Sequence, residues 1–314
     1  MRVLVVKTSS LGDILHAYPV IAYLKERHAV IEWVVEDRCR ELIEEHPDIT
    51  RAWVISTRCW RKGKNLASLA TFYREFSRKR FDLVIDLQGN LKSACFTFLA
   101  KSPVKIGWGW KTAPEKLNTF ATNRRYDPVE GKNIREDLLY LVQSYFGDFS
   151  IPNQPISQTP GKGTLVCPGA HWKTKRLPLE TLKKVVKLCP EPVSYIWGTD
   201  EEKQICLALA KEKGELLPKL SLWQLRQEML KRELVVAMDS LPLHLAATTS
   251  VATWSFFGPS SASKYKPMGE QHQALQGVCP YGVEFSKRCP QLRTCKTGSC
   301  LTVGLKESKL LPVK

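Results

Sequence analysis

Residues 3–13 read Val-Leu-Val-Val-Lys-Thr-Ser-Ser-Leu-Gly-Asp and carry the clearest structural signal in the chain. The four apolar residues at the start of this stretch are typical of a buried strand. After Asp13, apolar residues recur at helical spacing as far as Leu24, so the pattern predicts a strand, a tight loop and a helix. Pro19 lies inside the helical stretch and is expected to kink or interrupt it, because proline lacks a backbone donor.

The same alternation continues along the first half of the chain. Further buried strands are predicted at residues 32–35, 52–55 and 83–87, separated by segments long enough for crossover connections. Alternating strands and helices favour a parallel sheet covered on both faces.

A polar stretch rich in proline and glycine, residues 151–163, interrupts this rhythm and predicts an interdomain linker. The rhythm then restarts, with strands predicted at 164–167, 193–197, 234–238 and 252–257, and helices from 179, from 201, at 222–231 and around 244. With 314 residues, the chain is expected to form two α/β domains, 1–155 and 156–314. The tail after Gly258 is predicted to be irregular.

Composition excludes several classes of protein. The 43% hydrophobic and 25% charged residues lie in the globular range, so a disordered or fibrous chain is not expected. The opening apolar run is too short for a signal peptide, and no stretch approaches the roughly 20 apolar residues of a membrane span. We therefore expect a cytoplasmic protein, in which the ten cysteines are reduced thiols by default.

The chain is strongly basic, with 47 Lys and Arg against 31 Asp and Glu and a formal charge of +16. This favours an anionic partner such as nucleic acid, a phosphorylated substrate or an acidic membrane surface. Residues 57–80 hold eight of the basic side chains and one acid, Glu75. Nucleic-acid binding stays an alternative on charge, although the sequence has no recognisable recognition helix or aromatic ribonucleoprotein motif.

In doubly wound sheets, ligands bind beyond the carboxyl ends of the strands, so the residues that follow each predicted strand are candidates. These residues are Asp13, Gln88 and the stretches 169–176, 198–202 and 239–244. Their positions predict a site in a cleft between the two halves.

Asp13 has two interpretations. At a helix start it can act as a general base toward an attacking hydroxyl, or it can simply cap the helix. Ser9, Ser10 and Gly12 offer hydroxyl and backbone donors to an anion, although their loop is not a Gly-x-Gly-x-x-Gly motif.

In the second half, the segments after three strands suggest a phosphate and ribose site. Lys175 is placed to neutralise a leaving pyrophosphate, within a loop that also holds Ala170 and His171. The stretch 239–244 offers backbone donors, Ser240 and His244, and Glu201 or Glu202 is placed to hold ribose hydroxyls. A solvated basic loop, a capped helix with one core histidine and an ordinary acidic first turn are the structural alternatives.

Arg58, Arg61 and Lys62, around Trp60, are candidates for gripping phosphate or carboxylate. Four cysteines of the tail are spaced C-x9-C-x5-C-x4-C, without the paired C-x2-C spacing of a strong zinc signal, so free thiols are favoured over a metal site. These cysteines are Cys279, Cys289, Cys295 and Cys300. The absence of an Asp-x-Asp pair favours a reaction without a metal ion.

The motifs together resemble the ADP-heptose:lipopolysaccharide heptosyltransferase family, over nearly the whole chain. The resemblance rests on V-K-T-S-S-L-G-D at 6–13, I-D-L-Q-G-N-L-K-S-A at 85–94, T-K-R-L-P at 174–178, W-G at 197–198 and D-S-x-x-x-H at 239–244. Each motif is modest, but their order and spacing are specific.

The resemblance implies a GT-B fold with two Rossmann-like domains facing a central cleft, and inverting transfer of heptose or a related sugar. The N-terminal domain would bind Kdo attached to lipid A at the cytoplasmic face of the inner membrane, and the C-terminal domain an ADP-sugar. Asp13 matches the base, Lys175 the phosphate-facing lysine and Glu202 the ribose-binding glutamate. Asp239, Ser240 and His244 match the donor motif, and Arg58, Trp60, Arg61 and Lys62 the acceptor loop, with Gln88 assigned to the acceptor side.

Two positions depart from the family pattern. Leu241, followed by Pro242, stands where the donor motif has glycine, and Pro114 stands where an acceptor-side arginine is usual. Arg124, Arg125 and Arg135 are possible substitutes. The resemblance implies no cofactor beyond the ADP-sugar co-substrate and no nucleic-acid partner, and a non-catalytic nucleotide-sugar-binding protein on the same scaffold stays a third interpretation.

Overall fold

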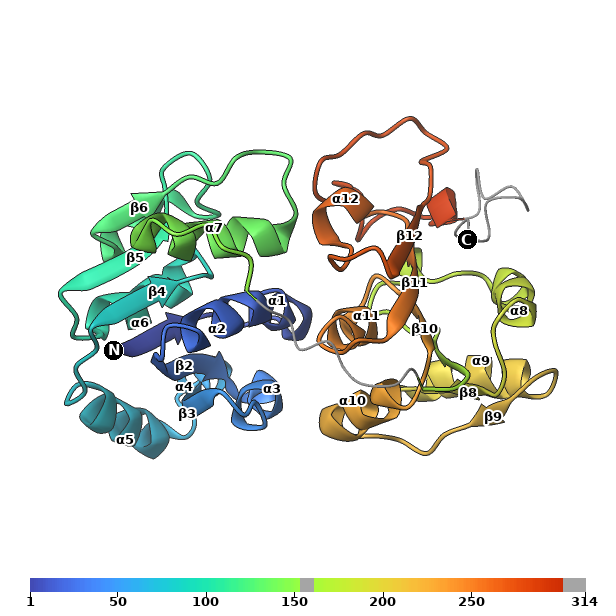
Figure 1. The fold of residues 1–314 in the computed structure, drawn as a ribbon, viewed down its shortest axis with the longest axis horizontal. Helices are drawn as coiled ribbons and strands as arrows, with labels where there is room; N and C mark the ends of the chain where they lie inside the picture. Colours follow the sequence, from blue (N-terminus) through green and yellow to red (C-terminus); the bar gives the residue numbers. More distant parts are fainter. Residues whose placement is uncertain (153–160, 302–314) are drawn as a thin grey trace. The chain divides into compact units, whose positions relative to one another are not determined.

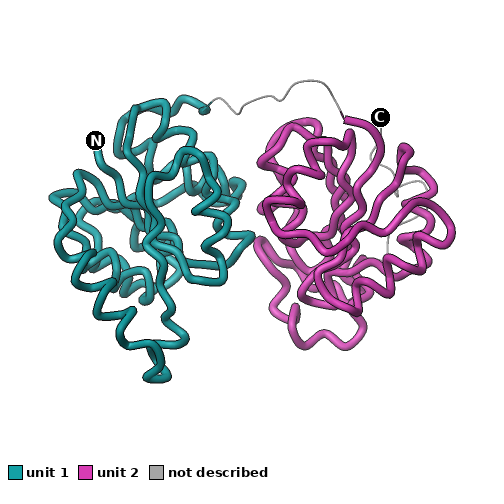
Figure 2. Tube along the Cα trace, turned by 90° about the horizontal axis from the view of Figure 1, so that it is seen from below, with its two compact units in different colours: residues 1–154 teal, residues 155–314 magenta. Residues whose placement is uncertain are grey.

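The computed structural model describes residues 1–152 and 161–301. The chain divides into two compact units, Met1–Gln154 and Pro155–Lys314 (Figure 2). The predicted boundary between residues 155 and 156, and most of the predicted linker, fall outside the described residues. Each unit has its own sheet, so each is described separately.

Unit 1 is built on a six-stranded sheet in the order β3-β2-β1-β4-β5-β6, in which every neighbouring pair is parallel (Figure 1). Its strands are β1 Arg2–Val6, β2 Val30–Glu36, β3 Ile49–Ile55, β4 Leu83–Asp86, β5 Val104–Trp108 and β6 Arg124–Tyr126. The first four confirm the sequence prediction; the apolar runs of β1, β2 and β4 are buried, and that of β3 is buried at Trp53 and Ile55.

The helices of unit 1 form the crossovers that parallel strands require. They are α1 Leu11–Leu15, α2 Tyr18–Lys25, α3 Glu41–Glu44, α4 Thr57–Trp60, α5 Leu66–Phe76, α6 Leu91–Leu99 and α7 Ile134–Phe146, with short 3-10 turns η1 Asp37–Cys39 and η2 Lys116–Ala121. Pro19 breaks the predicted first helix in two. It occupies the first turn of α2, where its missing N–H leaves no intrahelical bond unmade.

Unit 2 repeats the design with the sheet order β12-β11-β10-β7-β8-β9, again parallel throughout. Its strands are β7 Thr164–Cys167, β8 Val193–Tyr195, β9 Glu215–Leu216, β10 Leu234–Met238, β11 Ala252–Phe257 and β12 His272–Gln276. The other elements are α8 Leu179–Lys187, α9 Asp200–Ala210, α10 Leu222–Leu230, α11 Leu241–Ala246, α12 Ala262–Tyr265, η3 Lys173–Lys175 and η4 Ser299–Leu301.

The prediction of an irregular tail after Gly258 is wrong for its first part. Residues 262–265 form α12, and β12 pairs in parallel with β11 to complete the sheet. The strand was not predicted because its sequence, His-Gln-Ala-Leu-Gln, contains no apolar run. A strand at the edge of a sheet can form without such a run, because it pairs on one side only. Beyond it, residues 277–298 contain no helix or strand.

Within the described residues, no helix has both the length and the apolar character needed to cross a membrane.

Candidate active site

In unit 1, Asp13 lies at the start of α1, directly beyond β1. The N-cap residue is Ser10, whose backbone N–H and hydroxyl donate to Asp13 Oδ2 over 3.0 and 2.8 Å. Asp13 Oδ1 lies 3.9 Å from Nδ1 of His16, and the carboxylate is 32% exposed. The capping interpretation therefore holds in a modified form, because Asp13 is the third helical residue of a capping box. The carboxylate is both held in one orientation and open to solvent.

The loop between β1 and α1 is tied to the end of β4 by Gln88. Its Oε1 accepts the backbone N–H groups of Thr8 and Ser9, over 3.1 and 3.3 Å. Because the N–H of Ser10 goes to Asp13, the backbone donors of Ser9 and Ser10, which were expected to meet an anion, are engaged within the protein. Gly12 lies inside α1, where its carbonyl accepts the N–H of His16. Gln88 thus positions the loop that carries Asp13.

Two buried charged residues lie beneath this loop. Lys7 has its Nζ 3.1 Å from the carbonyl oxygen of Leu87. Burial lowers the pKa of Lys7, and the charges of Asp13 and Asp86 oppose that shift only in part. Asp86 is fully buried, and its burial raises its pKa although five residues donate to it. These donors are Gln88, Gly89, Ser93, Thr97 and Asn118.

A polar cluster that the sequence analysis did not single out joins the ends of β1 and β2 to α6. Lys92 Nζ lies 3.0 Å from Glu36 Oε1 and 3.4 Å from the hydroxyl of Ser9, and Thr57 also donates to Glu36. Glu36 ends β2, so the rule of strand ends would have identified it, whereas Lys92 lies within α6 and was signalled only by the quoted stretch at 85–94.

The predicted acceptor residues divide into exposed cations and a packed aromatic ring. Arg58, Arg61 and Lys62 are exposed at the end of α4 and just beyond it. Trp60 instead packs against Phe72, with ring centroids 5.8 Å apart, and its Nε1 donates to Ser68 over 2.9 Å. The indole of Trp60 is partly buried against the core of unit 1, and its role as an acceptor contact stays a prediction.

The three arginines considered as substitutes for an arginine at Pro114 differ in exposure. Arg124 is exposed, Arg125 donates to the carbonyls of Thr119 and Thr122, and Arg135 is buried. Pro114 itself packs on the loop after β4, where a Cβ on Gly89 would come within 2.6 Å of its ring. Arg124 and Arg125 are both exposed, but the guanidinium of Arg125 is held by those two carbonyls.

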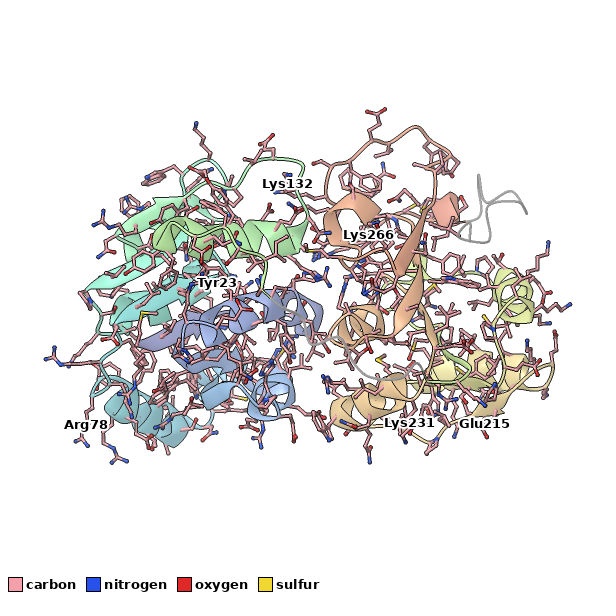
Figure 3. All side chains as sticks on the ribbon, in the orientation of Figure 1. Tyr23, Arg78, Lys132, Glu215, Lys231 and Lys266 are labelled. Atoms are coloured by element: carbon pink, nitrogen blue, oxygen red, sulfur yellow. The ribbon has the colours of Figure 1, made fainter. Side chains whose placement is uncertain are left out.

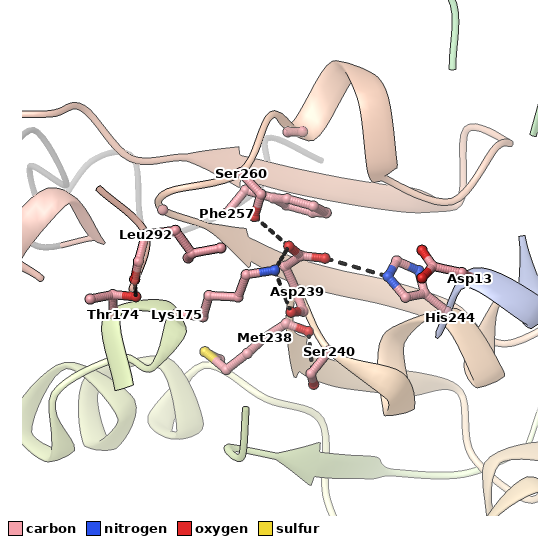
Figure 4. Close-up of polar contacts among 12 residues, drawn as sticks. Asp13, Thr174, Lys175, Met238, Asp239, Ser240, His244, Phe257, Ser260 and Leu292 are labelled. Carbon is pink, nitrogen blue, oxygen red and sulfur yellow. Dashed lines mark hydrogen bonds and ion pairs between the residues drawn. The ribbon is translucent and has the colours of Figure 1, made fainter. Parts of the chain in front are cut away.

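In unit 2, Asp239 is the centre of a buried polar cluster at the ends of β7 and β10 (Figure 4). Its Oδ2 lies 2.5 Å from Lys175 Nζ and also accepts the hydroxyl of Ser260, while Oδ1 lies 3.4 Å from His244 Nε2. Burial opposes ionisation of Asp239, but the hydrogen bond from His244 and the charge of Lys175 outweigh it. They hold the pKa of this carboxyl well below its usual range.

The motif that follows Asp239 forms α11 as predicted. Ser240 is the N-cap, and its hydroxyl donates to the carbonyl of Gly169 over 2.9 Å, which joins the two loops. Leu241 and Pro242 occupy the first helical turn, where proline is well tolerated. The departure from glycine at 241 therefore leaves the helix start intact.

Glu202 is held where the loops after β7 and β8 meet. Its Oε2 accepts the N–H groups of Gly198 and Thr199 over 2.8 and 3.2 Å. A Cβ built on Gly169 would lie 2.2 Å from Glu202 Oε1, so only glycine fits there without moving the glutamate. Glu201 pairs with Arg176 and Lys173 instead.

The remaining predicted donor residues lie on the loop between β7 and η3. Ala170 is buried, with its carbonyl accepting Arg176 Nε over 2.7 Å, whereas His171 is exposed and lies edge-on to Trp172. The structure thus gathers all of the predicted residues of unit 2 around three adjoining loops.

The four cysteines of the tail line one pocket, together with Thr174 of η3. All ten cysteines of the chain are free thiols, and the described residues hold no group of three or more His, Cys, Asp or Glu side chains placed to bind a metal ion. Thr174 donates to the carbonyl of Leu292 over 3.0 Å, so the cysteine segment packs on the turn that carries Lys175.

Comparisons with known proteins show which family the chain belongs to. The family model described as Glycosyltransferase family 9 (heptosyltransferase) matches residues 69–294. Lipopolysaccharide heptosyltransferase 1 of Pseudomonas aeruginosa is 31% identical, over 92% of this chain and 87% of that protein. Lipopolysaccharide heptosyltransferase 1 of Escherichia coli K12 is 28% identical, over 83% of this chain and 88% of that protein.

Solved structures show the same relationship. The structure of E. coli heptosyltransferase WaaC with ADP is similar with a TM-score of 0.78 and 27% identity, covering 88% of this chain and 93% of that one. The E. coli ADP-heptose lps heptosyltransferase II structure, 18% identical with a TM-score of 0.68, shares the fold over 96% of both chains. Together with the two parallel six-stranded sheets, these similarities confirm the predicted α/β class and GT-B fold.

Proposed function

The chain belongs to glycosyltransferase family 9, the heptosyltransferases, and we propose that it transfers a heptose from an ADP-sugar to the Kdo and lipid A inner core of lipopolysaccharide. The observation that carries the proposal is the Asp239 cluster, which places a lysine and a histidine at the strand ends of the unit expected to bind the donor. Relatives solved with ADP and with an ADP-heptose analogue support the choice of donor.

The Asp239 cluster suits a diphosphate. The Lys175 ammonium has three N–H donors, and Asp239 engages it through Oδ2 and through the backbone carbonyl. A further donor is thus available to a phosphate oxygen, while the pairing fixes the direction of the ammonium. Lys175 then neutralises the charge that develops on the departing ADP, which is the electrostatic stabilisation that this reaction requires. Because a protein cation neutralises this negative charge, we propose a reaction without a metal ion and with no cofactor besides the ADP-sugar.

Asp13 is the proposed base. As the acceptor hydroxyl attacks the anomeric carbon, its proton passes to the Asp13 carboxylate and the bond from that carbon to the ADP oxygen breaks. A single displacement of this kind inverts the anomeric configuration. The capping contacts from Ser10 support the role, because they hold one carboxylate oxygen and so orient the other.

The exposed cations of unit 1 are the proposed contacts to the acceptor. Arg58, Arg61 and Lys62 suit the carboxylates of Kdo, because guanidinium groups bind carboxylates in two-pronged fashion. We also assign Gln88 to the acceptor side, because it lies beside the loop that carries Asp13. Since that acceptor is anchored in lipid, we propose that the protein works in the cytoplasm, peripherally at the inner face of the inner membrane.

The test is a transfer assay with purified protein, ADP-heptose and a Kdo-lipid A acceptor, following ADP release and product mass. Asp13→Ala is expected to lose transfer by at least about a hundredfold while its affinity for ADP-heptose, measured by calorimetry, stays near that of the native chain. Near-normal turnover by Asp13→Ala would show that another group is the base. Undiminished activity in EDTA is expected, and loss of activity restored by a divalent ion would overturn the metal-free reaction.

A further inference from the structure

Helix α5 of unit 1 carries buried apolar side chains and, beside them, exposed ones. Phe72 and Phe76 are buried and pack on each other with ring centroids 5.0 Å apart, which docks the helix on the sheet. Leu66, Leu69 and Tyr73 are 54%, 37% and 56% exposed. Their spacing of three and four residues aligns them as one stripe along the helix. Core packing therefore explains only the two phenylalanines.

The stripe is bordered by positive charge. Lys62 and Lys64 precede the helix, Arg74 lies within it, and Arg78 follows it, projecting outward in Figure 3. Glu75 is the one acid among residues 57–80, and Arg51 already pairs with it, with 2.5 Å between the guanidinium and Oε2. The field around the exposed stripe is thus positive.

An exposed apolar stripe within a basic border is the pattern of helices that lie in a membrane interface, with apolar side chains among the acyl chains and cations at the lipid phosphates. A nucleic acid would use the cations and could stack on Tyr73, but it offers nothing to two exposed leucines. We propose that Leu66, Leu69, Tyr73, Arg74 and Arg78, here called the α5 surface, dock the protein on an anionic lipid bilayer.

The inference rests on the proposed function in one respect, that the acceptor is anchored in lipid. The basic loop proposed to grip that acceptor ends at Lys62, four residues before the stripe begins at Leu66. Docking through α5 would therefore hold Arg58 and Arg61 at the level of the lipid headgroups, where the acceptor sugars emerge.

The experiment is co-sedimentation of the full chain with vesicles that contain no acceptor. One set is phosphatidylcholine alone and the other includes phosphatidylglycerol. We expect binding to the anionic vesicles only. The triple variant Leu66→Ser/Leu69→Ser/Tyr73→Ser is expected to bind at least about tenfold more weakly, because three apolar side chains no longer leave water. Arg74→Glu/Arg78→Glu should bind about tenfold more weakly and lose most of its salt dependence.

The matched control is Phe98→Ser/Phe120→Ser, which removes two apolar side chains of unit 1 that are 73% and 68% exposed outside α5. It should bind vesicles as the native chain does. Equal binding by the α5 variants and the native chain, or loss of binding in the control alone, would overturn the proposal. So would binding to single-stranded RNA without binding to vesicles. Circular dichroism shows whether each variant is folded, and the charge variant leaves the stripe intact if the triple variant fails to fold.

Transfer to a delipidated, water-soluble Kdo acceptor separates the two proposals. The α5 variants should retain that activity while losing activity on acceptor in vesicles. Vesicle binding by a native chain that transfers nothing would refute the proposed function and leave the docking surface standing. Transfer by a native chain that binds no vesicles would support the proposed function and refute the docking surface.

Discussion

The carboxylate of Asp239 and the ammonium of Lys175 form a buried ion pair, with 2.5 Å between Oδ2 and Nζ and side-chain exposures of 5% and 11%. The two residues are 64 positions apart, so the pair joins the turn after β7 to the end of β10. His244 and Ser260 complete the set of partners around the carboxylate. The pair fixes the Lys175 ammonium beyond the strand ends of unit 2. We expect the stability of unit 2 to depend on the Asp239 carboxylate that neutralises it.

Replacing Asp239 with Asn would leave the Lys175 ammonium buried without its counter-charge. Removing one member of a buried pair costs about 3–5 kcal/mol, so we expect a loss of about 3 kcal/mol in guanidinium unfolding, together with weak donor binding. The double variant Lys175→Met/Asp239→Leu should recover most of the stability but none of the donor affinity. An Asn variant as stable as the native chain would show that the ion pair contributes little.

The same pair predicts a pH dependence of stability. The pKa of Asp239 is lowered on folding from its ordinary 3.8, so the unfolded chain binds the proton more readily than the folded one. The contribution of Asp239 is therefore complete above about pH 4 and is lost as the pH falls below that value. Urea unfolding between about pH 6 and pH 2 should show a steeper fall for the native chain than for Lys175→Met/Asp239→Leu. Parallel curves would refute the assignment.

The close approach of Gly169 to Glu202 allows a test of the proposal that Glu202 binds the ribose. A methyl group at 169 would collide with the Glu202 carboxylate, which the N–H groups of Gly198 and Thr199 hold in place. Gly169→Ala is expected to weaken ADP-heptose binding about tenfold, since the carboxylate must move. Because both changes act through one carboxylate, Gly169→Ala/Glu202→Ala should bind no more weakly than Glu202→Ala alone. Additive losses in calorimetry would mean that Gly169 acts on the donor directly.

The exposed arginines after β3 should act on the acceptor alone. In Arg58→Ala/Arg61→Ala we expect the KM for the Kdo acceptor to rise about tenfold or more, from lost charge-assisted hydrogen bonds, with little change in donor KM. Arg38→Ala, which removes an exposed cation elsewhere in unit 1, serves as the control. An equal rise in that control would point to a general charge effect. Trp60→Ala, unlike the arginine variants, should lower the melting temperature of the protein, because the indole packs on Phe72.

Much of the fold could be predicted because its central strands are apolar runs. Residues 164–167, 234–238 and 252–257 are observed as β7, β10 and β11 with the predicted bounds. Strands β5 and β6 were missed because Val-Lys-Ile-Gly-Trp and Arg-Arg-Tyr carry cations and glycine toward the edge of the sheet. Such strands form through pairing with a distant neighbour, which a local pattern does not contain.

The candidate site was predictable to a similar degree and for a similar reason. Residues after a central strand, such as Asp13, Gln88 and Asp239, follow from sheet topology once the strands are known. Ser260 also follows a central strand, β11, so the rule covers its position, but its contact with Asp239 depends on the approach of two loops distant in sequence. The tie between Gly169 and Glu202 was equally hidden, because it depends on the approach of two loops 33 residues apart in sequence.

The buried charge of Lys7 is expected to lower the stability of the fold while it supports the activity of the proposed base. Burial lowers its pKa from 10.5, so at neutral pH the fold carries the cost of a buried ammonium beside the charges of Asp13 and Asp86. Since the unfolded chain binds this proton more tightly, the cost is complete below the folded pKa of Lys7 and disappears as the pH rises toward 10.5. Lys7→Met removes the charge but also the bond to the carbonyl of Leu87. We therefore expect the stability of the variant relative to the native chain, measured by urea unfolding, to decrease as the pH rises from the folded pKa of Lys7 toward 10.5.

The same substitution removes a positive charge from beneath the proposed base. We expect the acid limb of the pH profile of kcat/KM to move to higher pH in Lys7→Met, because the ionised Asp13 carboxylate loses a stabilising neighbour. Lys7→Arg, which keeps a charge but is larger, should restore the limb partly if it folds. A profile unchanged in Lys7→Met, with only kcat reduced, would mean that Lys7 holds the loop in shape and does not act on the base electrostatically.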